Sequence, residues 1–167
     1  MSLRPKKCKA CSGEMASSRE AYRYNESGLP NVILKDVEVR RCRNCGAQEV
    51  PLPRVAELHR AIAMALVHKP ARFLGAEIRY LRKHMGWSGV DFASRIGVTP
   101  ETVSRWENER EPISTSSDRL LRMMVVRGWP VEDYSADDLV NIDDRRDPPP
   151  VHVELRVQNH HWAAPAA

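Results

Sequence analysis

Long hydrophobic runs are missing from this 167-residue sequence. Its longest apolar stretch, Ala61 to Val67, is far shorter than the about 20 residues that a membrane-spanning helix needs. No signal-peptide pattern opens the sequence, so we expect a soluble, cytoplasmic protein with no membrane partner. Glycine-rich phosphate loops and zinc-protease motifs are also missing, and the six histidines lack metal-ligand spacing. We therefore expect no enzymatic activity.

Cysteine is confined to the first 45 residues of the chain, where it forms two Cys-x-x-Cys pairs. The pairs are Cys8 with Cys11 and Cys42 with Cys45, and 30 residues separate them. Two-residue gaps let tight turns bring four thiolates onto one tetrahedral Zn²⁺. Because protein ligands fill all four positions, no site is left for a water nucleophile, and we expect one structural zinc per chain. Disulfides, redox-active thiols and a rubredoxin-like iron site are the alternatives, although a reducing cytoplasm favours metal ligation over disulfides.

Charge is distributed unevenly along the chain, whose net value is +4. Residues 1–67 carry 12 lysines and arginines against 7 acidic residues, and residues 68–129 carry 11 against 7. In contrast, residues 130–167 carry 3 against 8. Two basic segments thus precede an acidic tail, and basic surfaces attract both phosphates and acidic partners.

Residues 22–41 have the pattern of short strands, with apolar β-branched residues at Val32–Leu34 and Val37–Val39 and a turn at Ser27–Pro30. Both cysteine pairs would lie at the ends of a small antiparallel sheet, which has too little apolar mass to fold without metal. Residues 1–53 are therefore predicted to form a zinc-ribbon-like domain.

A linker helix is predicted next, over residues 54–70. Its apolar face consists of Val55, Leu58, Ile62 and Leu66. Pro70 ends this helix because proline disfavours helical geometry in the residue before it.

Residues 71–129 follow the pattern of an all-α domain of short helices. The first helix ends at Gly86, Ser88 is the expected N-cap of the second, and Thr99 is that of the third. The residues expected to face the core from the second helix are Val90, Phe92, Ala93 and Ile96. Two short helices joined by a tight turn at Gly97 form the helix-turn-helix plan, in which the second helix lies in the DNA major groove.

This segment resembles the helix-turn-helix domain of phage repressors, the XRE or Cro/C1 type. The positions that carry the resemblance are Glu77-Ile78-Arg79, Leu81-Arg82, Gly86-Trp87-Ser88, Phe92-Ala93, Gly97-Val98, Thr102–Glu107 and Pro112. A cysteine module placed ahead of it, with Gly13-Glu14-Met15 after the first pair, further resembles the MqsA (YgiT-type) antitoxins of bacterial type II toxin–antitoxin systems. The resemblance implies a zinc domain that engages a toxin. It also implies a C-terminal domain that dimerises and represses its own operon at a palindromic operator.

The third helix of this domain carries the expected base readers. Glu101, Thr102 and Arg105 face outward from it, and Ser104 is a further candidate. Arg105 is the leading one, because a guanidinium can bond bidentately to guanine O6 and N7. The carboxylate of Glu101 is repelled by phosphates and can only accept a hydrogen bond from a base. The residues expected to contact phosphates are Ser88, Asn108, Arg110, Thr115 and, through its backbone N–H, Gly89.

The resemblance also implies a structural ion pair between Arg82 of the first helix and Glu107 of the third. It offers no role for the tail, residues 130–167, which is acidic and then rich in proline. Residues 151–158 alternate between apolar and polar, which predicts a strand. Such a strand could join the zinc-domain sheet, pair with a second copy, or stay disordered.

The expected fold class is α+β, with a small zinc-bound antiparallel β domain, an all-α helix-turn-helix domain and an extended C-terminal tail. The expected function is that of a homodimeric, sequence-specific repressor of double-stranded DNA, the antitoxin of a type II system with a toxin protein as partner. One alternative is a zinc-finger and helix-turn-helix regulator that acts without a toxin. A metal-thiolate redox protein is the other.

Overall fold

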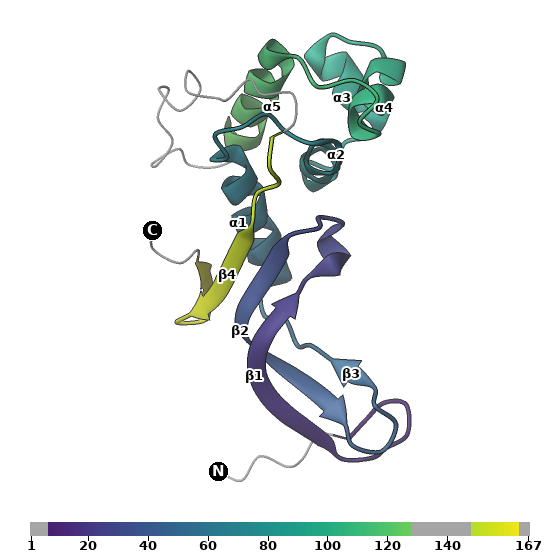
Figure 1. Cartoon of the computed structure of the whole chain (residues 1–167), viewed down its shortest axis with the longest axis vertical. Coiled ribbons are helices and arrows are strands. Elements are labelled where there is room, and N and C mark those ends of the chain that lie inside the picture. The colour runs from purple at the N-terminus through teal and green to yellow at the C-terminus, as the bar shows by residue number, and fades with distance from the viewer. Residues whose placement is uncertain (1–6, 128–147, 164–167) are drawn as a thin grey trace.

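The computed structural model of the chain describes residues 7–127 and 148–163. An N-terminal sheet is followed by five helices, and a C-terminal hairpin returns to the sheet (Figure 1). The α+β fold class is as predicted. The acidic part of the tail, residues 130–147, lies outside the described ranges. Within those ranges, none of the helices has the length and apolarity of a membrane span.

The sheet is built around one long hairpin. Strand β1 (Met15–Arg23) pairs antiparallel with β2 (Val32–Cys42), and a short 3-10 turn at Asn25–Ser27 joins them. Where two strand pieces were predicted, β2 is continuous through Asp36, which adopts a left-handed φ of 56°. This irregularity coincides with a register shift in β1. A short strand, β3 (Gln48–Glu49), pairs with the far end of β2.

The C-terminal hairpin completes the sheet on the other side of β2. Strand β4 (Val153–Gln158) runs parallel to β2, with Val153 opposite Val32 and Arg156 opposite Lys35. Strand β5 (His161–Ala163) pairs antiparallel with β4. The alternating residues of the tail therefore lie in the N-terminal sheet, which is mixed rather than wholly antiparallel. Residues more than 100 positions apart are neighbours in it.

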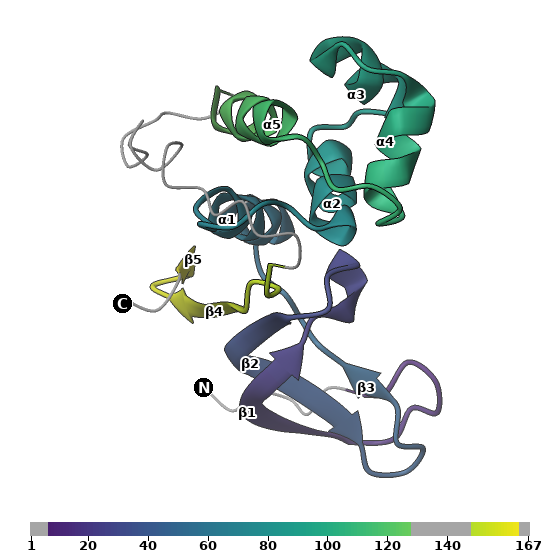
Figure 2. The ribbon, with the colours of Figure 1, turned by 45° about the horizontal axis from the view of Figure 1, so that its top comes forward.

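Helix α1 (Val55–Val67) lies between the sheet and the other helices (Figure 2). Its Leu58, Ile62 and Leu66 are fully buried, whereas Val55 is largely exposed. The buried apolar side chains of the sheet, of α1 and of the remaining helices form one continuous cluster. Because α1 contributes to both sides of this cluster, it joins the two parts of the molecule through packing.

The four helices that follow are α2 (Gly75–His84), α3 (Gly89–Ile96), α4 (Pro100–Glu107) and α5 (Thr115–Arg127). Both predicted N-caps are confirmed: Ser88 Oγ accepts from the Asp91 N–H at 3.1 Å, and Thr99 Oγ1 accepts from the Thr102 N–H at 3.2 Å. One predicted core residue is misplaced. Val90 lies in the first turn of α3 on its outer side and is 64% exposed.

A buried arginine fixes the connection between α1 and α2. Arg122 of α5 donates from Nε to Asp118 Oδ1 at 2.7 Å. Its Nη1 donates to the carbonyls of Val67 and Lys69 at 2.5 and 2.6 Å, and its Nη2 donates to that of Ala71 at 2.8 Å. One side chain thereby satisfies the carbonyl of the last residue of α1, which lacks a partner within the helix, and two carbonyls of the connection to α2.

Two further contacts fix the same connection. Asp118 Oδ2 accepts from the Phe73 N–H at 2.8 Å, and the buried Lys69 ammonium lies 3.0 Å from Glu77 Oε2. That Glu77 oxygen also accepts from the Leu74 N–H at 2.8 Å, at the start of α2. Both buried charge pairs are hydrogen-bonded to backbone groups, which is the condition for burying charge at tolerable cost.

Replacement of Arg122 tests this connection. The Arg122→Ala substitution leaves Asp118 without its cation and three buried carbonyls without a donor, so we expect the free energy of unfolding to fall by about 3–5 kcal/mol. Arg119→Ala, which removes an exposed arginine of the same helix, should change it by no more than about 0.5 kcal/mol. Urea denaturation followed by circular dichroism measures both, and equal effects would contradict the assignment.

Candidate DNA interface and metal centre

The four cysteines converge at the far end of the sheet. Their Sγ atoms all lie within 4.8 Å of one another. The Sγ atoms of Cys8 and Cys45 are 3.7 Å apart, and those of Cys11 and Cys42 are 3.4 Å apart. Tetrahedral zinc with bonds of about 2.3 Å places its sulfurs about 3.8 Å apart, so the cluster has the size of a four-thiolate site.

The backbone of each cysteine pair forms the turn that such a site needs. The Cys8 N–H donates to the Gly13 carbonyl at 2.8 Å, and the Cys42 N–H donates to that of Ala47 at 2.9 Å. A side chain at Gly13 would crowd the cluster, because its Cβ would lie 3.2 Å from Cys11 Sγ and 3.3 Å from Cys42 Sγ. Glycine at this position therefore has a steric reason, the close approach of two cysteine sulfurs.

The environment of Cys11 favours the thiolate that metal binding requires. Hydrogen bonding by the Gly13 backbone N–H, with a further contribution from the Asn44 side chain, lowers the pKa of Cys11 to about 6. None of the four cysteines forms a disulfide. Four soft donors with no carboxylate or imidazole among them suit Zn²⁺ and would also suit iron.

At the other end of the molecule, α3 and α4 form the pair of short helices predicted from sequence. A side chain at Gly75 would lie 2.7 Å from the carbonyl oxygens of Trp106 and Glu107, so α2 begins in close contact with the end of α4. Trp106 and Val103 face the core. This packing leaves the opposite face of α4 in solvent, where Glu101, Ser104 and Arg105 are exposed.

The structure contains the Arg82–Glu107 pair and adds a second arginine to it. Arg82 Nε donates to Glu107 Oε1 at 2.6 Å, and Arg79 Nε donates to Glu107 Oε2 at 3.2 Å. Arg82 also donates to the Trp87 carbonyl at 2.8 Å, in the turn before α3. The Glu107 carboxylate thus joins α2, α4 and the intervening turn. Arg79 was not predicted as a partner of Glu107, although its position one turn before Arg82 places it on the same helix face.

The predicted base readers lie close together on α4. Arg105 Nη2 donates to Thr102 Oγ1 at 3.1 Å, and its side chain is 53% exposed. The pKa of Glu101 is lowered by a hydrogen bond from its own backbone N–H, then by the Thr99 hydroxyl and by the charge of Arg105. Glu101 therefore stays ionised at neutral pH, and its carboxylate is directed toward the helix N-terminus, where negative charge is favoured.

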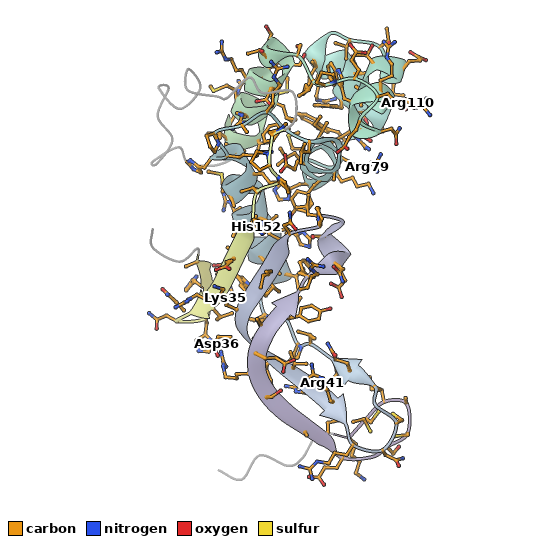
Figure 3. The ribbon with its side chains drawn as sticks, viewed as in Figure 1. Lys35, Asp36, Arg41, Arg79, Arg110 and His152 are labelled. Carbon is orange, nitrogen blue, oxygen red and sulfur yellow. The ribbon has the colours of Figure 1, made fainter. Side chains whose placement is uncertain are left out.

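The predicted phosphate-contacting residues occupy less uniform positions. Asn108 and Arg110 are exposed just beyond α4, and Arg110 lies on the same outer side of the molecule as Arg79 (Figure 3). The Asn108 side chain is already engaged, because its Nδ2 donates to the Ser104 carbonyl at 2.8 Å and its Oδ1 accepts from Arg79 at 3.1 Å.

The remaining three phosphate candidates are close to helix starts. Ser88 is exposed at the N-cap of α3, beside Gly89. Thr115, at the start of α5, accepts from Arg72 at 3.2 Å and is only partly exposed. Of these residues, Gly89 offers a backbone N–H at the start of a helix, which suits a phosphate oxygen. The Ser88 N–H already donates to Asp91 Oδ2 at 2.9 Å, so only the side chain of Ser88 faces solvent.

Comparison with protein families gives one match. Residues 78–123, which extend from α2 into α5, match a model of the helix-turn-helix family. This segment is a helix-turn-helix domain. Domains of this family bind DNA, so the match supports the interpretation of the chain as a sequence-specific DNA-binding regulator. The comparisons with curated proteins and with solved structures give no match.

The match does not extend to the cysteine module, so the specific resemblance to MqsA-type antitoxins stays a prediction. The matched residues include α3 and α4. In helix-turn-helix domains generally, the second helix of the pair enters the major groove, and the exposed face of that helix here, α4, carries Arg105.

The metal centre generates a testable expectation. We expect purified protein to contain one zinc per chain and a chelator to abolish the ordered amide signals of Met15–Ser18 and Val39–Cys42 in NMR spectra. The physical reason is that this end of the hairpin lies far from the helices (Figure 1), and that among its residues only Val39 and Cys42 are buried. The amides of α3 and α4 should keep their positions.

Two variants serve as controls for the chelation experiment. Cys45→Ser should reproduce the effect of the chelator, whereas Ser18→Ala, on the adjoining strand, should retain the metal. Loss of the helical circular dichroism signal on chelation would show that the metal holds the whole molecule together.

Proposed function

We propose that this protein is a homodimeric, sequence-specific DNA-binding regulator with a structural zinc in its N-terminal module. The observation that carries the proposal is the exposed face of α4 within the matched helix-turn-helix, where Arg105 extends into solvent. A guanidinium on the outer face of a recognition helix has the donors needed for guanine O6 and N7.

Contacts to the DNA divide into two kinds in this proposal. Arg105 reads a base edge, and Thr102, Ser104 and Glu101 lie beside it on the same helix. Arg110 neutralises a phosphate, since its side chain makes no hydrogen bond or ion pair to another described residue and is free to bind one. At the start of α3, Gly89 adds a backbone donor and Ser88 adds its exposed hydroxyl.

Zinc is the metal that best suits the cysteine module. Four thiolates fill the coordination shell, so the ion has no open position for substrate and its contribution is to hold two turns together.

The outer face of α5 supports a homodimer. Leu120 and Met123 are 39% and 48% exposed there, one helical turn apart near the middle of the helix. A two-fold axis through this face would bring Leu120 of one protomer against Met123 of its partner and bury both. Two recognition helices related in this way would read operator half-sites about one helical turn of DNA, or 10 base pairs, apart.

DNA binding is tested with duplexes taken from the region upstream of the protein's own coding sequence. Arg105→Ala should cost about 1–3 kcal/mol of operator binding and relax discrimination at one base pair, because a bidentate contact is lost. Arg110→Ala should lower the affinity for operator and scrambled duplexes alike, because only a phosphate contact is lost. The salt dependence of binding should fall by about one charge. Fluorescence anisotropy across a salt series measures both.

The control for this experiment is Arg23→Ala, which removes an exposed arginine of β1 and should leave DNA binding unchanged. Saturation should occur at two chains per operator duplex, and one chain per duplex would rule out the dimer. If the wild-type protein bound operator and scrambled duplexes equally, the proposal of sequence-specific regulation would be wrong.

We further propose that the protein is the antitoxin of a type II system and represses its own operon. Support comes from the order of its modules and from their placement, since the end of β2 at Cys42 and the helices α3 and α4 lie at opposite ends of the molecule (Figure 1). A toxin held by the cysteine module would therefore leave the DNA-reading face open.

The antitoxin role predicts a neighbouring reading frame for a small, basic, ribonuclease-like protein. We expect the two proteins to co-purify when expressed together and the toxin's growth inhibition to be relieved by this chain. The Cys42→Ser variant should no longer bind the toxin. The Arg105→Ala variant should still bind the toxin and lose only operator binding. Absence of such a frame would favour a regulator without a toxin.

A further inference from the structure

The exposed guanidinium of Arg105 is held by an acidic residue from outside its helix. Arg105 Nε lies 3.2 Å from Glu111 Oε2, and Arg105 Nη2 donates to Thr102 Oγ1 at 3.1 Å. Both members of the ion pair are about half exposed, at 53% and 49%. The leading base-reading side chain of the recognition helix is therefore paired before any DNA is present.

The end of α4 brings Glu111 back toward Arg105. Beyond the helix, the Glu109 N–H donates to the Trp106 carbonyl at 3.1 Å and the Arg110 N–H donates to the Arg105 carbonyl at 2.9 Å. Glu109 adopts a left-handed φ of 56° between these two bonds. This is the hydrogen-bond pattern that reverses a chain at a helix C-terminus. The reversal places Glu111, six positions later in sequence, alongside the base-reading arginine.

The two contacts leave part of the guanidinium available. They engage Nε and one hydrogen of Nη2, and neither involves Nη1. Both hydrogens of Nη1 and the second of Nη2 can thus meet acceptors outside the protein, which is enough for a bidentate contact to guanine. Because Glu111 and Thr102 limit how the side chain rotates, Arg105 loses less conformational freedom when it binds a base.

The ion pair with Glu111 also lowers the contribution of Arg105 to non-specific DNA binding. Non-specific binding comes mainly from cations that neutralise phosphates, and an arginine already paired with a carboxylate contributes little to it. A guanine edge is uncharged and presents two acceptors, so it can bond the free side of the guanidinium without displacing the carboxylate. The same carboxylate repels phosphate oxygens that approach.

We propose that Glu111 is a specificity-determining residue that orients Arg105 toward a guanine edge and lowers the protein's affinity for non-operator DNA. This inference rests on the proposed function as a DNA-binding regulator. It assigns to the loop after α4 a positioning role, one that acts on the base through Arg105 and needs no contact between Glu111 and the DNA.

The test uses the full-length protein with Glu111→Gln, which keeps the size of the side chain and removes its charge. We expect affinity for a scrambled duplex to rise by about two- to fivefold, as for loss of an exposed ion pair. The ratio of operator to scrambled affinity should fall by about five- to tenfold, because the arginine is also less well oriented. Fluorescence anisotropy at several salt concentrations gives both quantities, and thermal denaturation verifies folding.

Two matched variants separate this effect from general electrostatics. Glu109→Gln removes a neighbouring charge from the same loop without an ion pair to Arg105, so it should change the ratio much less than Glu111→Gln. In an Arg105→Ala background, Glu111→Gln should leave the ratio unchanged, because the residue through which it acts is gone. An effect that persists in that background, or an equal effect of Glu109→Gln, would overturn the inference.

The outcomes also distinguish this inference from the function on which it rests. A wild-type protein that discriminates operator from scrambled DNA, combined with an unchanged ratio in Glu111→Gln, overturns the role of Glu111 alone. Failure of the wild-type protein to discriminate overturns both.

Discussion

The buried guanidinium of Arg122 is the constraint on which the arrangement of this molecule depends. A charge removed from water is tolerated only when its partners satisfy it, and here Asp118 and three backbone carbonyls do so. Those carbonyls belong to the connection between α1 and α2. The direction in which the chain leaves the helix that packs on the sheet is therefore set by a side chain of the last helix. The Lys69–Glu77 pair holds the next residues of the same connection.

A second constraint acts within the DNA-reading part. Glu107 binds arginines from two successive turns of α2, and the absence of a side chain at Gly75 lets that helix begin against the end of α4. Because α4 is held at its C-terminal end, its N-terminal half can remain exposed without losing its orientation. These charge pairs thus hold the proposed recognition helix in place, while Arg105, Thr102 and Glu111 form a separate group on its exposed face.

Local rules in the sequence predicted much of this structure. The α+β class, the caps at Ser88 and Thr99 and the convergence of the cysteines all follow from residue types at short spacing, which is where such rules are strongest. Val90 was misplaced because a single apolar residue in a first turn satisfies helical periodicity without facing the core. Spacing does suggest the pair of Arg122 with Asp118, which lies four positions earlier on the same helix. The three carbonyls that Arg122 also binds are brought to it by tertiary packing, and Glu111 is brought to Arg105 by the left-handed residue Glu109, so neither contact could be inferred from spacing.

The parallel pairing of β4 with β2 gives the chain an unusual folding order. Residues 32–35 can pair with residues 153–156 only after a loop of more than 100 residues has closed, and the N-terminal sheet is incomplete until then. Contacts so distant in sequence slow folding, while the helices between them form from near neighbours. During synthesis the helical segment can therefore reach its structure while β2 still presents an unpaired edge to chaperones and proteases. The cysteine module, although translated first, acquires its last strand only when the C-terminal hairpin has emerged.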